Sequence, residues 1–400
     1  MGLKPSRSVL YEFRDRAAKF VDQLHQQIVR LAQAEKKVEG RQTVQDGTIV
    51  RACASRHFLH HSETMQRRLN ELNEAVRKDS AGITAHPSHR WIARTVNGRA
   101  RQALRYQKAC QELQKRLAIN AKRQAGKRLP TKHVVISVSD PEAALGRDKE
   151  KVFGPCYSIQ CVTDAQSLLI VAFDVIARTS DAGMLAPMLD RTRDILGRFP
   201  DQHIADAAYV TTLDLKDSNV REVQLVGPFQ ENDLTERKRQ QKPRRKKLGK
   251  EAFRWLPKKQ TYRCPQGHEL KLHQRGRVER SDGRTLMQSR FRCPPVHCLA
   301  CPLAASCCTT PRNGRIIKRL DGEELLEKHQ RYMKTTDAKK LLRKRGSVIE
   351  RTFADFKAHR GLRRLHGRGL SRATAEIGLV IIAHNILRCY CLRRKTGNSS

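Results

Sequence analysis

Apolar residues recur with a helical period near both ends of the chain. Residues 7–37 keep a 3.6-residue period up to Gly40, which predicts one basic amphipathic helix. Residues 62 to about 128 carry two apolar stripes in a polar setting, which predicts a helical hairpin. A helical pattern begins again after Glu323 and leads into a helix that contains Glu350. Residues 374–388 predict a last helix, whose apolar side chains we expect to pack in the core.

Short apolar and β-branched runs fill the middle of the chain and predict strands. Asp181 is expected to cap a helix that Gly197 and Pro200 end, and residues 164–167 are expected to form a hairpin turn. Strands that alternate with helices indicate the α/β class, with a mixed sheet flanked by helices. The predicted strands are residues 43–52, 133–138, 156–162, 168–176, 203–206 and 223–226.

Three acids lie on different predicted elements. Asp46 falls within the first strand, although Asp-Gly is also a common hairpin turn, and Asp206 ends a short strand. Glu350 shares a helix face with Lys357, seven residues on, and an ordinary solvated salt bridge is the alternative for this acid. Carboxylates supplied by separate elements are what two divalent ions need when they act on a phosphodiester.

Composition points to a polyanionic partner. The 400 residues include 80 Lys and Arg against 40 Asp and Glu, a formal net charge of +40, which is difficult to reconcile with a metabolic enzyme for small solutes. The charge is concentrated in residues 237–250 and 339–368. We expect a cytoplasmic protein without a membrane partner, because no apolar run reaches about 18 residues and no signal peptide begins the chain.

Twelve cysteines in a cytoplasmic protein are expected to be thiols or metal ligands. Cys298 and Cys301 have the spacing of a zinc knuckle, and Cys264 with Cys307 could complete a tetrahedral structural site. His268 and Cys293 are alternative ligands. Simple thiols in an insertion are the other interpretation, because a second C-x-x-C pair is missing.

Four motifs together resemble the DDE-type transposases of bacterial insertion sequences, in the branch whose RNase H-like domain carries a cysteine-bearing insertion. The resemblance extends from about Pro5 to Arg388. The motifs are Asp46-Gly47-Thr48 followed by Ala54-Ser55, then Ser139-Asp140-Pro141-Glu142-Ala143, then Ala205-Asp206-Ala207-Ala208-Tyr209, and finally Arg345 with Glu350 and Lys357.

The resemblance implies an RNase H-like mixed sheet flanked by helices, with two insertions. The usual N-terminal DNA-binding region would be missing apart from a remnant helix. The implied parts are the remnant at 1–40, the catalytic core at 41–61 and 129–228, a helical hairpin insertion at 62–128, a basic and Cys-rich insertion at 229–330, and the Glu helix with the C-terminal helix at 331–400.

Carried onto this chain, the resemblance implies that Asp46, Asp206 and Glu350 bind two Mg²⁺ or Mn²⁺ ions. Asp140 competes with Asp46 for the first role, and the order of the strands favours Asp46. Arg345 and Lys357 would contact DNA phosphates. Ala208 stands where the family usually has Gly, and a positive φ there would cost about 1 kcal/mol.

The implied activity is metal-dependent cleavage of double-stranded DNA at transposon ends, followed by strand transfer, with a homodimer assembled on DNA. Two alternatives are a truncated, catalytically inactive transposase that only binds DNA, and a metal-dependent DNA nuclease of the same fold. All three readings share the basic surface; they differ in whether the acids cut and whether the cut end is then joined.

Overall fold

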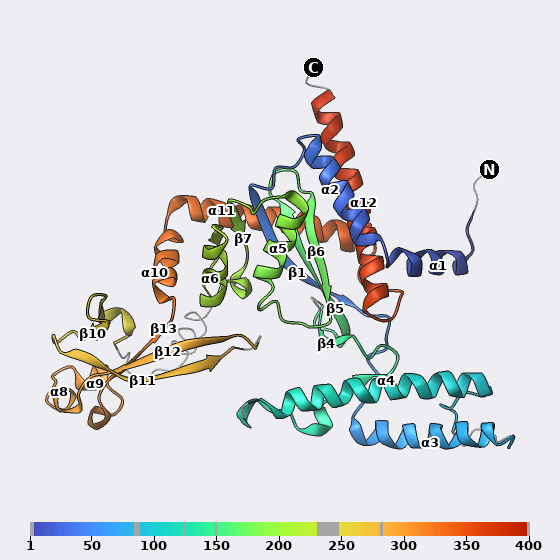
Figure 1. Ribbon diagram of the computed structural model, residues 1–400, viewed down its shortest axis with the longest axis horizontal. Helices are drawn as coiled ribbons and strands as arrows, with labels where there is room; N and C mark the ends of the chain where they lie inside the picture. Colours follow the sequence, from blue (N-terminus) through green and yellow to red (C-terminus); the bar gives the residue numbers. More distant parts are fainter. Residues whose placement is uncertain are drawn as a thin grey trace. The chain divides into compact units, whose positions relative to one another are not determined.

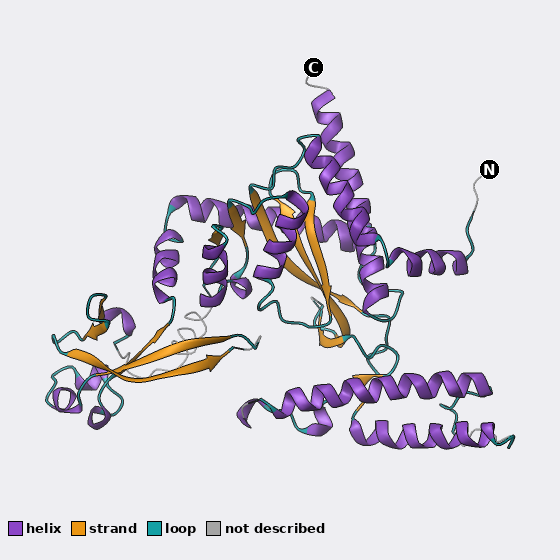
Figure 2. Cartoon of the chain, viewed as in Figure 1, coloured by secondary structure: helices purple, strands orange, loops and turns teal. Residues whose placement is uncertain are grey.

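The chain combines helices with mixed β-sheets, so the expected α/β class is confirmed (Figures 1 and 2). The computed structural model describes residues 4–83, 89–123, 125–148, 150–229, 248–280 and 283–397, so most of the basic run 237–250 lies outside it. Two compact units divide the chain. The first comprises Met1–Glu39, Asp46–Ser180 and Val348–Ser400, and the second comprises Gly40–Gln45 and Asp181–Ser347.

The first unit contains an antiparallel sheet covered by helices. Strand β5 pairs with β4 on one side and with β6 in a hairpin, and β1 is the other neighbour of β5 in the strand order. Strand β1 (Gln42–Arg51) and helix α11 (Thr336–Ala354) each continue into the second unit. The other elements are α1 (Arg7–Ala17), α2 (Val21–Ala34), β2 (Leu59–His60), α3 (Ser62–Ser80), α4 (Val96–Ala121), β3 (Ile136–Ser137), β4 (Ala144–Arg147), β5 (Phe153–Asp164), β6 (Ile170–Ile176) and α12 (Leu370–Gly397).

Helix α12 packs against α2 and β6, and this contact explains its apolar sequence. A side chain at Gly378 would come within 2.5 Å of Val21 and 3.2 Å of Phe173, so the helices and sheet approach closely only because this position is glycine. The side-chain amide of Asn385 accepts a hydrogen bond from the backbone N–H of Ile170 and donates one to its carbonyl oxygen. By length and composition alone Leu370–Arg394 could also cross a membrane, which the sequence analysis did not expect.

The predicted single helix over 7–37 is wrong in one respect. It is broken into α1 and α2 around Ala18–Phe20, where Phe20 leaves helical geometry with φ −131°. In α1 the apolar side chains Val9 and Phe13 stay about half exposed, whereas Val21 and Val29 of α2 are buried. The sequence shows no sign of this break, because the apolar period continues through it and no glycine or proline marks the turn.

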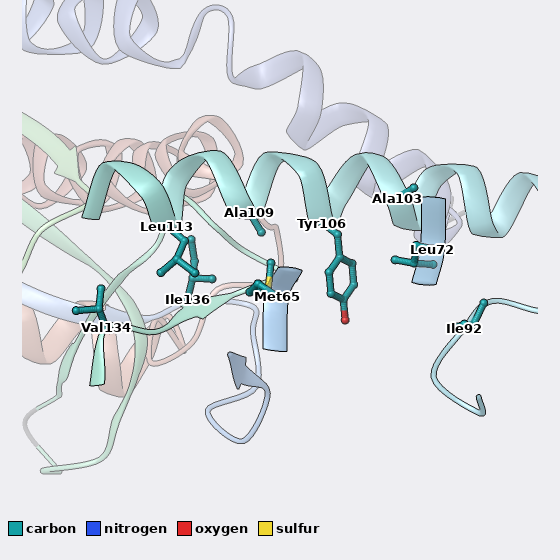
Figure 3. Packing of buried hydrophobic residues seen from close by; sticks show 9 residues of the cluster. All are labelled: Met65, Leu72, Ile92, Ala103, Tyr106, Ala109, Leu113, Val134 and Ile136. Atoms are coloured by element: carbon teal, nitrogen blue, oxygen red, sulfur yellow. The ribbon is translucent and has the colours of Figure 1, made fainter. Parts of the chain in front are cut away.

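The predicted helical hairpin is confirmed as α3 and α4. The two helices pack together, and β3 lies against α4. Figure 3 shows the shared core, in which Tyr106 of α4 lies among aliphatic side chains. The core consists of Met65, Leu72, Ile92, Ala103, Tyr106, Ala109, Leu113, Val134 and Ile136.

The second unit starts as a parallel sheet. The first residues of β1 pair with β7, and β7 pairs with β8, both in parallel. Helix α5 ends before Gly197, as expected, and Gly197 takes φ +74°. The helix begins after Met184, so the prediction that Asp181 caps it is wrong. The elements are α5 (Leu185–Leu196), β7 (Gln202–Ile204), α6 (Thr212–Val220), β8 (Gln224–Val226) and α10 (Glu323–Tyr332).

The cysteine-bearing segment of the second unit forms its own antiparallel sheet, in the order β13-β12-β11-β10-β9. The sequence analysis predicted no sheet here. The strands are β9 (Arg254–Leu256), β10 (Thr261–Arg263), β11 (Glu269–Glu279), β12 (Thr285–Arg292) and β13 (Ile316–Leu320), and two short helices, α8 (Pro295–Leu299) and α9 (Ala304–Cys307), lie between β12 and β13.

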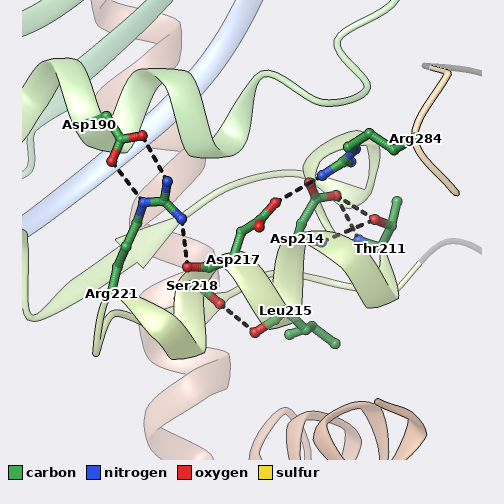
Figure 4. A network of polar contacts seen from close by, with 8 residues as sticks. All are labelled: Asp190, Thr211, Asp214, Leu215, Asp217, Ser218, Arg221 and Arg284. Carbon is green, nitrogen blue, oxygen red and sulfur yellow. Dashed lines mark hydrogen bonds and ion pairs between the residues drawn. The ribbon is translucent and has the colours of Figure 1, made fainter. Parts of the chain in front are cut away.

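A polar network anchors this sheet to helix α6 (Figure 4). Arg284, at the start of β12, donates to Asp214 at 2.8 Å and to Asp217 at 3.0 Å. Asp214 also completes a capping box with Thr211. Burial raises the pKa of the Asp214 carboxyl, and the Thr211 and Arg284 contacts oppose that rise. The guanidinium of Arg284 therefore stabilises a carboxylate that burial alone would disfavour.

Candidate functional site

Asp46 lies within β1 rather than in a hairpin turn, so the turn alternative is wrong. Gln45 and Thr48 are buried on either side of it, while Asp46 itself is partly exposed. The backbone N–H of Gly47 donates to Asp46 Oδ1 at 2.8 Å. The charge of Asp46 also helps to raise the pKa of the buried Cys161 thiol, after burial itself. The acid is thus held on a strand and remains partly exposed.

Lys357 lies beside the same strand. Its Nζ atom is 3.5 Å from the carbonyl oxygen of Ile49, three residues after Asp46. Lys357 belongs to a π-helical turn, Asp355–His359, that follows α11, and Phe356 in this turn is fully buried. A wider helical turn at this point places the lysine on β1 while the aromatic ring stays in the core.

Asp355 fastens that turn to the core. It accepts hydrogen bonds from Arg360 Nε at 2.6 Å and shares one of 2.8 Å with His384 Nδ1 of α12. Burial would raise the pKa of the Asp355 carboxyl, but the Arg360 and His384 contacts outweigh it and the pKa is lowered. Asp355 is therefore an ionised structural anchor.

Glu350 is exposed on α11. Its neighbours Ile349 and Phe353 are buried, with 4% and 3% of their surfaces exposed, so the helix turns its apolar stripe inward and this carboxylate outward. An outward carboxylate next to a buried stripe is available to a ligand.

Asp206 follows β7 in the second unit. The strand ends at Ile204, two residues earlier than predicted, and Asp206 caps the 3₁₀ helix Ala207–Tyr209. Its Oδ1 atom accepts the backbone N–H of Ala208 at 2.6 Å, and its Oδ2 atom is 3.7 Å from Arg345 Nη2. Ala208 lies in a short 3₁₀ helix and has no positive φ, so the conditional strain at this position does not arise. The structure therefore joins two residues that only the resemblance had linked.

The predicted residues fall into two groups. Asp46, Glu350 and Lys357 belong to the first unit, and Asp206 and Arg345 belong to the second. Among the described residues no three His, Cys, Asp or Glu side chains stand together as a ready-made metal site. In type, the carboxylates are the hard oxygen donors that Mg²⁺ and Mn²⁺ prefer.

Asp140, the competitor of Asp46, is buried with 1% of its surface exposed. The hydroxyl of Tyr157, itself fully buried, donates to Asp140 Oδ1 at 2.8 Å. Burial raises the pKa of the Asp140 carboxyl, and the Tyr157 hydrogen bond only partly offsets this. A shielded carboxyl that tends toward its neutral form is a weaker candidate ligand for a cation than Asp46.

All four predicted zinc ligands line one cavity of about 20 Å³ in the second unit, a volume that suits one water molecule or one ion. Two further cysteines, Cys293 and Cys308, line it as well; Cys293 was an alternative ligand, and Cys308 was missed although it follows Cys307 directly. The six thiols are those of Cys264, Cys293, Cys298, Cys301, Cys307 and Cys308.

The walls of this cavity are organised by backbone contacts. The N–H of Arg315 donates to Cys298 Sγ at 3.4 Å, and the N–H of Cys264 donates to the carbonyl of His268 at 2.8 Å. The rings of His268 and His297 stack at 4.1 Å. Burial raises the pKa of Cys293 and, to about 12, that of Cys308, with neighbouring thiols adding to both shifts. These thiols carry their protons at neutral pH unless a cation displaces them.

His203 is a buried residue that the sequence analysis passed over. Its Nδ1 atom lies 2.8 Å from Thr43 Oγ1 and its Nε2 atom 2.9 Å from Gln45 Oε1, so it links β7 to β1. Burial lowers the pKa of His203 to about 3, and the ring is neutral. This link positions β7, the strand that precedes Asp206.

Comparison with known protein families gives a match for this chain. Residues 263–390 match the family described as "Transposase DDE domain". The match includes Arg345, Glu350, Lys357 and the six cysteines that line the cavity, and it confirms the resemblance to DDE-type transposases. No curated protein matches.

A structural comparison matches the chain to a cryo-EM structure of the piggyBac transposase synaptic complex with hairpin DNA, at 8% sequence identity and a TM-score of 0.22. The match covers 62% of this chain and 47% of that one, so this chain spans about half the length of the matched protein.

Proposed function

We propose, from the premise that residues 263–390 belong to the transposase DDE domain family, that this chain is a DNA transposase. It cleaves double-stranded DNA at the ends of an insertion sequence and joins the exposed 3′ end to target DNA, in a reaction that depends on Mg²⁺ or Mn²⁺. The catalytic core adopts an RNase H-like arrangement with helical and Cys-rich insertions. The observation that carries the proposal is the family match across the segment that holds Arg345, Glu350 and Lys357.

In this proposal Asp46, Asp206 and Glu350 act together as the metal-binding carboxylates. Asp46 and Asp206 each accept a backbone N–H, from Gly47 and Ala208, which fixes one carboxylate oxygen, and both side chains remain partly exposed. When bound, the two ions would activate water and neutralise the leaving oxygen. Preference for Asp46 over Asp140 rests on the burial of Asp140 and its Tyr157 contact.

Arg345 and Lys357 hold the DNA phosphates near the cleaved bond. Arg345 is only partly exposed and already lies 3.7 Å from Asp206, so its guanidinium can bridge that acid and a phosphate oxygen. The Nζ atom of Lys357 reaches the carbonyl of Ile49 on β1, the strand that also carries Asp46. Catalysis then depends on positioning and on charge neutralisation, and no side chain acts as nucleophile.

The formal net charge of +40 supports DNA as the partner. Since both transposon ends must react, we infer a homodimer assembled on DNA, acting in the cytoplasm without a membrane partner. A catalytically silent DNA-binding protein and a nuclease without strand transfer are the two outcomes that the experiment below separates from this proposal.

The experiment measures cleavage and strand transfer on DNA that carries the element's own ends, with Mg²⁺ or Mn²⁺, for the intact chain and for Glu350→Gln. We expect loss of both products in Glu350→Gln with unchanged DNA affinity. Asp337→Asn, an exposed acid in the first turn of the same helix, is the matched control and should retain activity. DNA binding without cleavage by the intact chain would establish the binding-only alternative, and cleavage without joining would establish the nuclease.

We also propose that the cysteine-lined cavity holds a structural Zn²⁺, with Cys264, Cys298, Cys301 and Cys307 as ligands. The support is that all four thiols line a cavity with room for one ion. Since no three of them stand at ligand geometry, binding requires side-chain rotation and loss of thiol protons. Such a metal would hold the loops between β10, β12 and β13, and would have no direct role in the chemistry.

A further inference from the structure

The sheet formed by β11, β12 and β13 has two unlike faces. Residues Phe291, Ile317 and Arg319 alternate inward, and each is buried. Arg319 packs over Trp255 at 4.1 Å and bonds to the Tyr262 hydroxyl at 3.0 Å, which fixes this side as the core. The residues between them point to the opposite side.

That opposite side carries four basic residues in register. Lys271 of β11 pairs with Arg292 of β12, and Arg290 of β12 pairs with Lys318 of β13. Gln274 lies opposite Arg290 and accepts its Nη1 hydrogen bond at 3.1 Å, which confirms the shared face. We call Lys271, Arg290, Arg292 and Lys318 the basic face.

Two pairs of like charges therefore stand directly across strands, an arrangement that destabilises a sheet when it is left alone. In the part of the chain that the structure describes, none of the four joins an ion pair. The nearest acid along β11, Glu269, forms ion pairs with Lys259 at 2.8 Å and with Arg263 at 3.4 Å. The face thus lacks internal compensation for its charge.

We propose that the basic face is a docking surface for the phosphate backbone of double-stranded DNA. This inference rests on the proposed function, since it names a second surface, separate from the predicted catalytic residues, that binds the DNA substrate. A phosphate backbone supplies closely spaced negative charges, which neutralise cross-strand cations that the protein does not pair. Contacts of this kind position the DNA without reading its sequence.

The sheet gives the surface rigidity. The start of β12 is tied to α6 by Arg284, and Lys216 of α6 pairs with Asp321, which follows β13, at 2.5 Å. Both ties lie in the second unit, which also holds Asp206 and Arg345. Binding on this face therefore needs little ordering of the surface beyond the side chains themselves.

The test measures the affinity of the full chain for double-stranded DNA over a range of salt concentrations, in EDTA so that no cleavage occurs. The variant Arg290→Gln/Lys318→Gln removes two charges from the basic face. The control Arg275→Gln/Arg277→Gln removes two charges from exposed positions of β11 that pair with Ser289 and Met287, on the opposite face. Circular dichroism and thermal unfolding verify that both variants fold.

We expect the first variant to weaken binding at every DNA sequence and to reduce the slope of log affinity against log salt by about 2, since each phosphate contact contributes about 0.9. The control variant should change the slope much less. The variant Arg290→Lys/Lys318→Arg keeps both charges and should retain the slope of the intact chain.

Equal effects of the two double variants, or none from either, would overturn the inference while the intact chain still bound and cleaved its ends. If the intact chain bound no DNA at all, the proposed function itself would fail, and the inference with it.

Discussion

The Nη2 atom of Arg345 lies 3.7 Å from the Oδ2 atom of Asp206, so a residue of α11 and an acid that follows β7 meet in the second unit. The pair is partly exposed, with 23% and 41% of the two side chains accessible. At this distance and exposure the ion pair contributes little stability. Its value is the position of a guanidinium beside a carboxylate that we propose to be catalytic.

Arg345→Gln should therefore impair the reaction more than the fold. We expect cleavage to fall about 10- to 100-fold, because a hydrogen bond to a charged group contributes about 1.5–3 kcal/mol. Thermal unfolding should change little. The measurement is the single-turnover cleavage rate, with Arg343→Gln, an exposed basic residue of the same helix, as the control. Equal losses in both variants would show that only general charge matters.

His203 should make the stability of the protein sensitive to acid. Its pKa is lowered to about 3 in the folded chain, whereas an unfolded histidine titrates near 6.5. Between these values the unfolded state binds one more proton, so the free energy of unfolding falls as the pH is lowered through this window, by about 1.4 kcal/mol per pH unit for this group.

Chemical denaturation of the intact chain and of His203→Gln from pH 7 to pH 4.5 tests this. The variant should be less stable at pH 7, because the contacts with Thr43 and Gln45 are lost. Its stability should nevertheless decline less steeply on acidification. Parallel pH profiles would contradict the assignment of a buried neutral ring.

If the cysteine-lined cavity binds zinc, the metal content of the purified protein will show it. The purified chain should contain about one zinc per molecule by mass spectrometry, as one tetrahedral site requires. Cys298→Ser/Cys301→Ser should lose it and lower the unfolding temperature, whereas Cys53→Ser, in the first unit, should not. Zinc affinity should fall as the pH is lowered, because the thiols must lose protons to bind. A zinc-free protein whose stability is insensitive to chelators would contradict the proposal.

Local sequence signals predicted the regular parts of the fold. The β5–β6 hairpin, the helices α3 and α4, and the end of α5 at Gly197 follow from the apolar period and from turn and helix-ending residues. The sheet β9–β13 did not follow, because β11 is exposed at most of its positions and so lacks the alternation that marks a half-buried strand.

The sequence suggested three acids on separate elements, and the assignment of their roles came from the resemblance. Acids at strand ends are common, and nothing local distinguishes Asp206 from other acids until Arg345 is placed next to it by the fold. The same limit applies to the basic face, since the pairing of Arg290 with Lys318 depends on strand register. Burial, in contrast, separates Asp46 from Asp140, and the sequence carried only the strand order for that choice.

Asp140→Asn provides the last test, because it separates a structural acid from a catalytic one. Burial raises the pKa of Asp140 above its unfolded value, so ionising the group in the folded chain costs stability at neutral pH and costs nothing below the unfolded pKa near 3.9. The amide oxygen of asparagine can still accept the Tyr157 hydroxyl. The variant should be as stable as the intact chain or more stable at pH 7, and this difference should shrink as the pH falls toward 4.

Cleavage by Asp140→Asn should be retained, whereas Asp46→Asn should abolish it with DNA affinity unchanged. Thermal unfolding at several pH values and cleavage of the element's ends are measured on the same preparations. If Asp140→Asn destroys cleavage without loss of stability and Asp46→Asn does not, Asp140 is the first carboxylate of the reaction. Its buried pair with Tyr157 would then have to open before a metal ion could bind, which Tyr157→Phe should make easier.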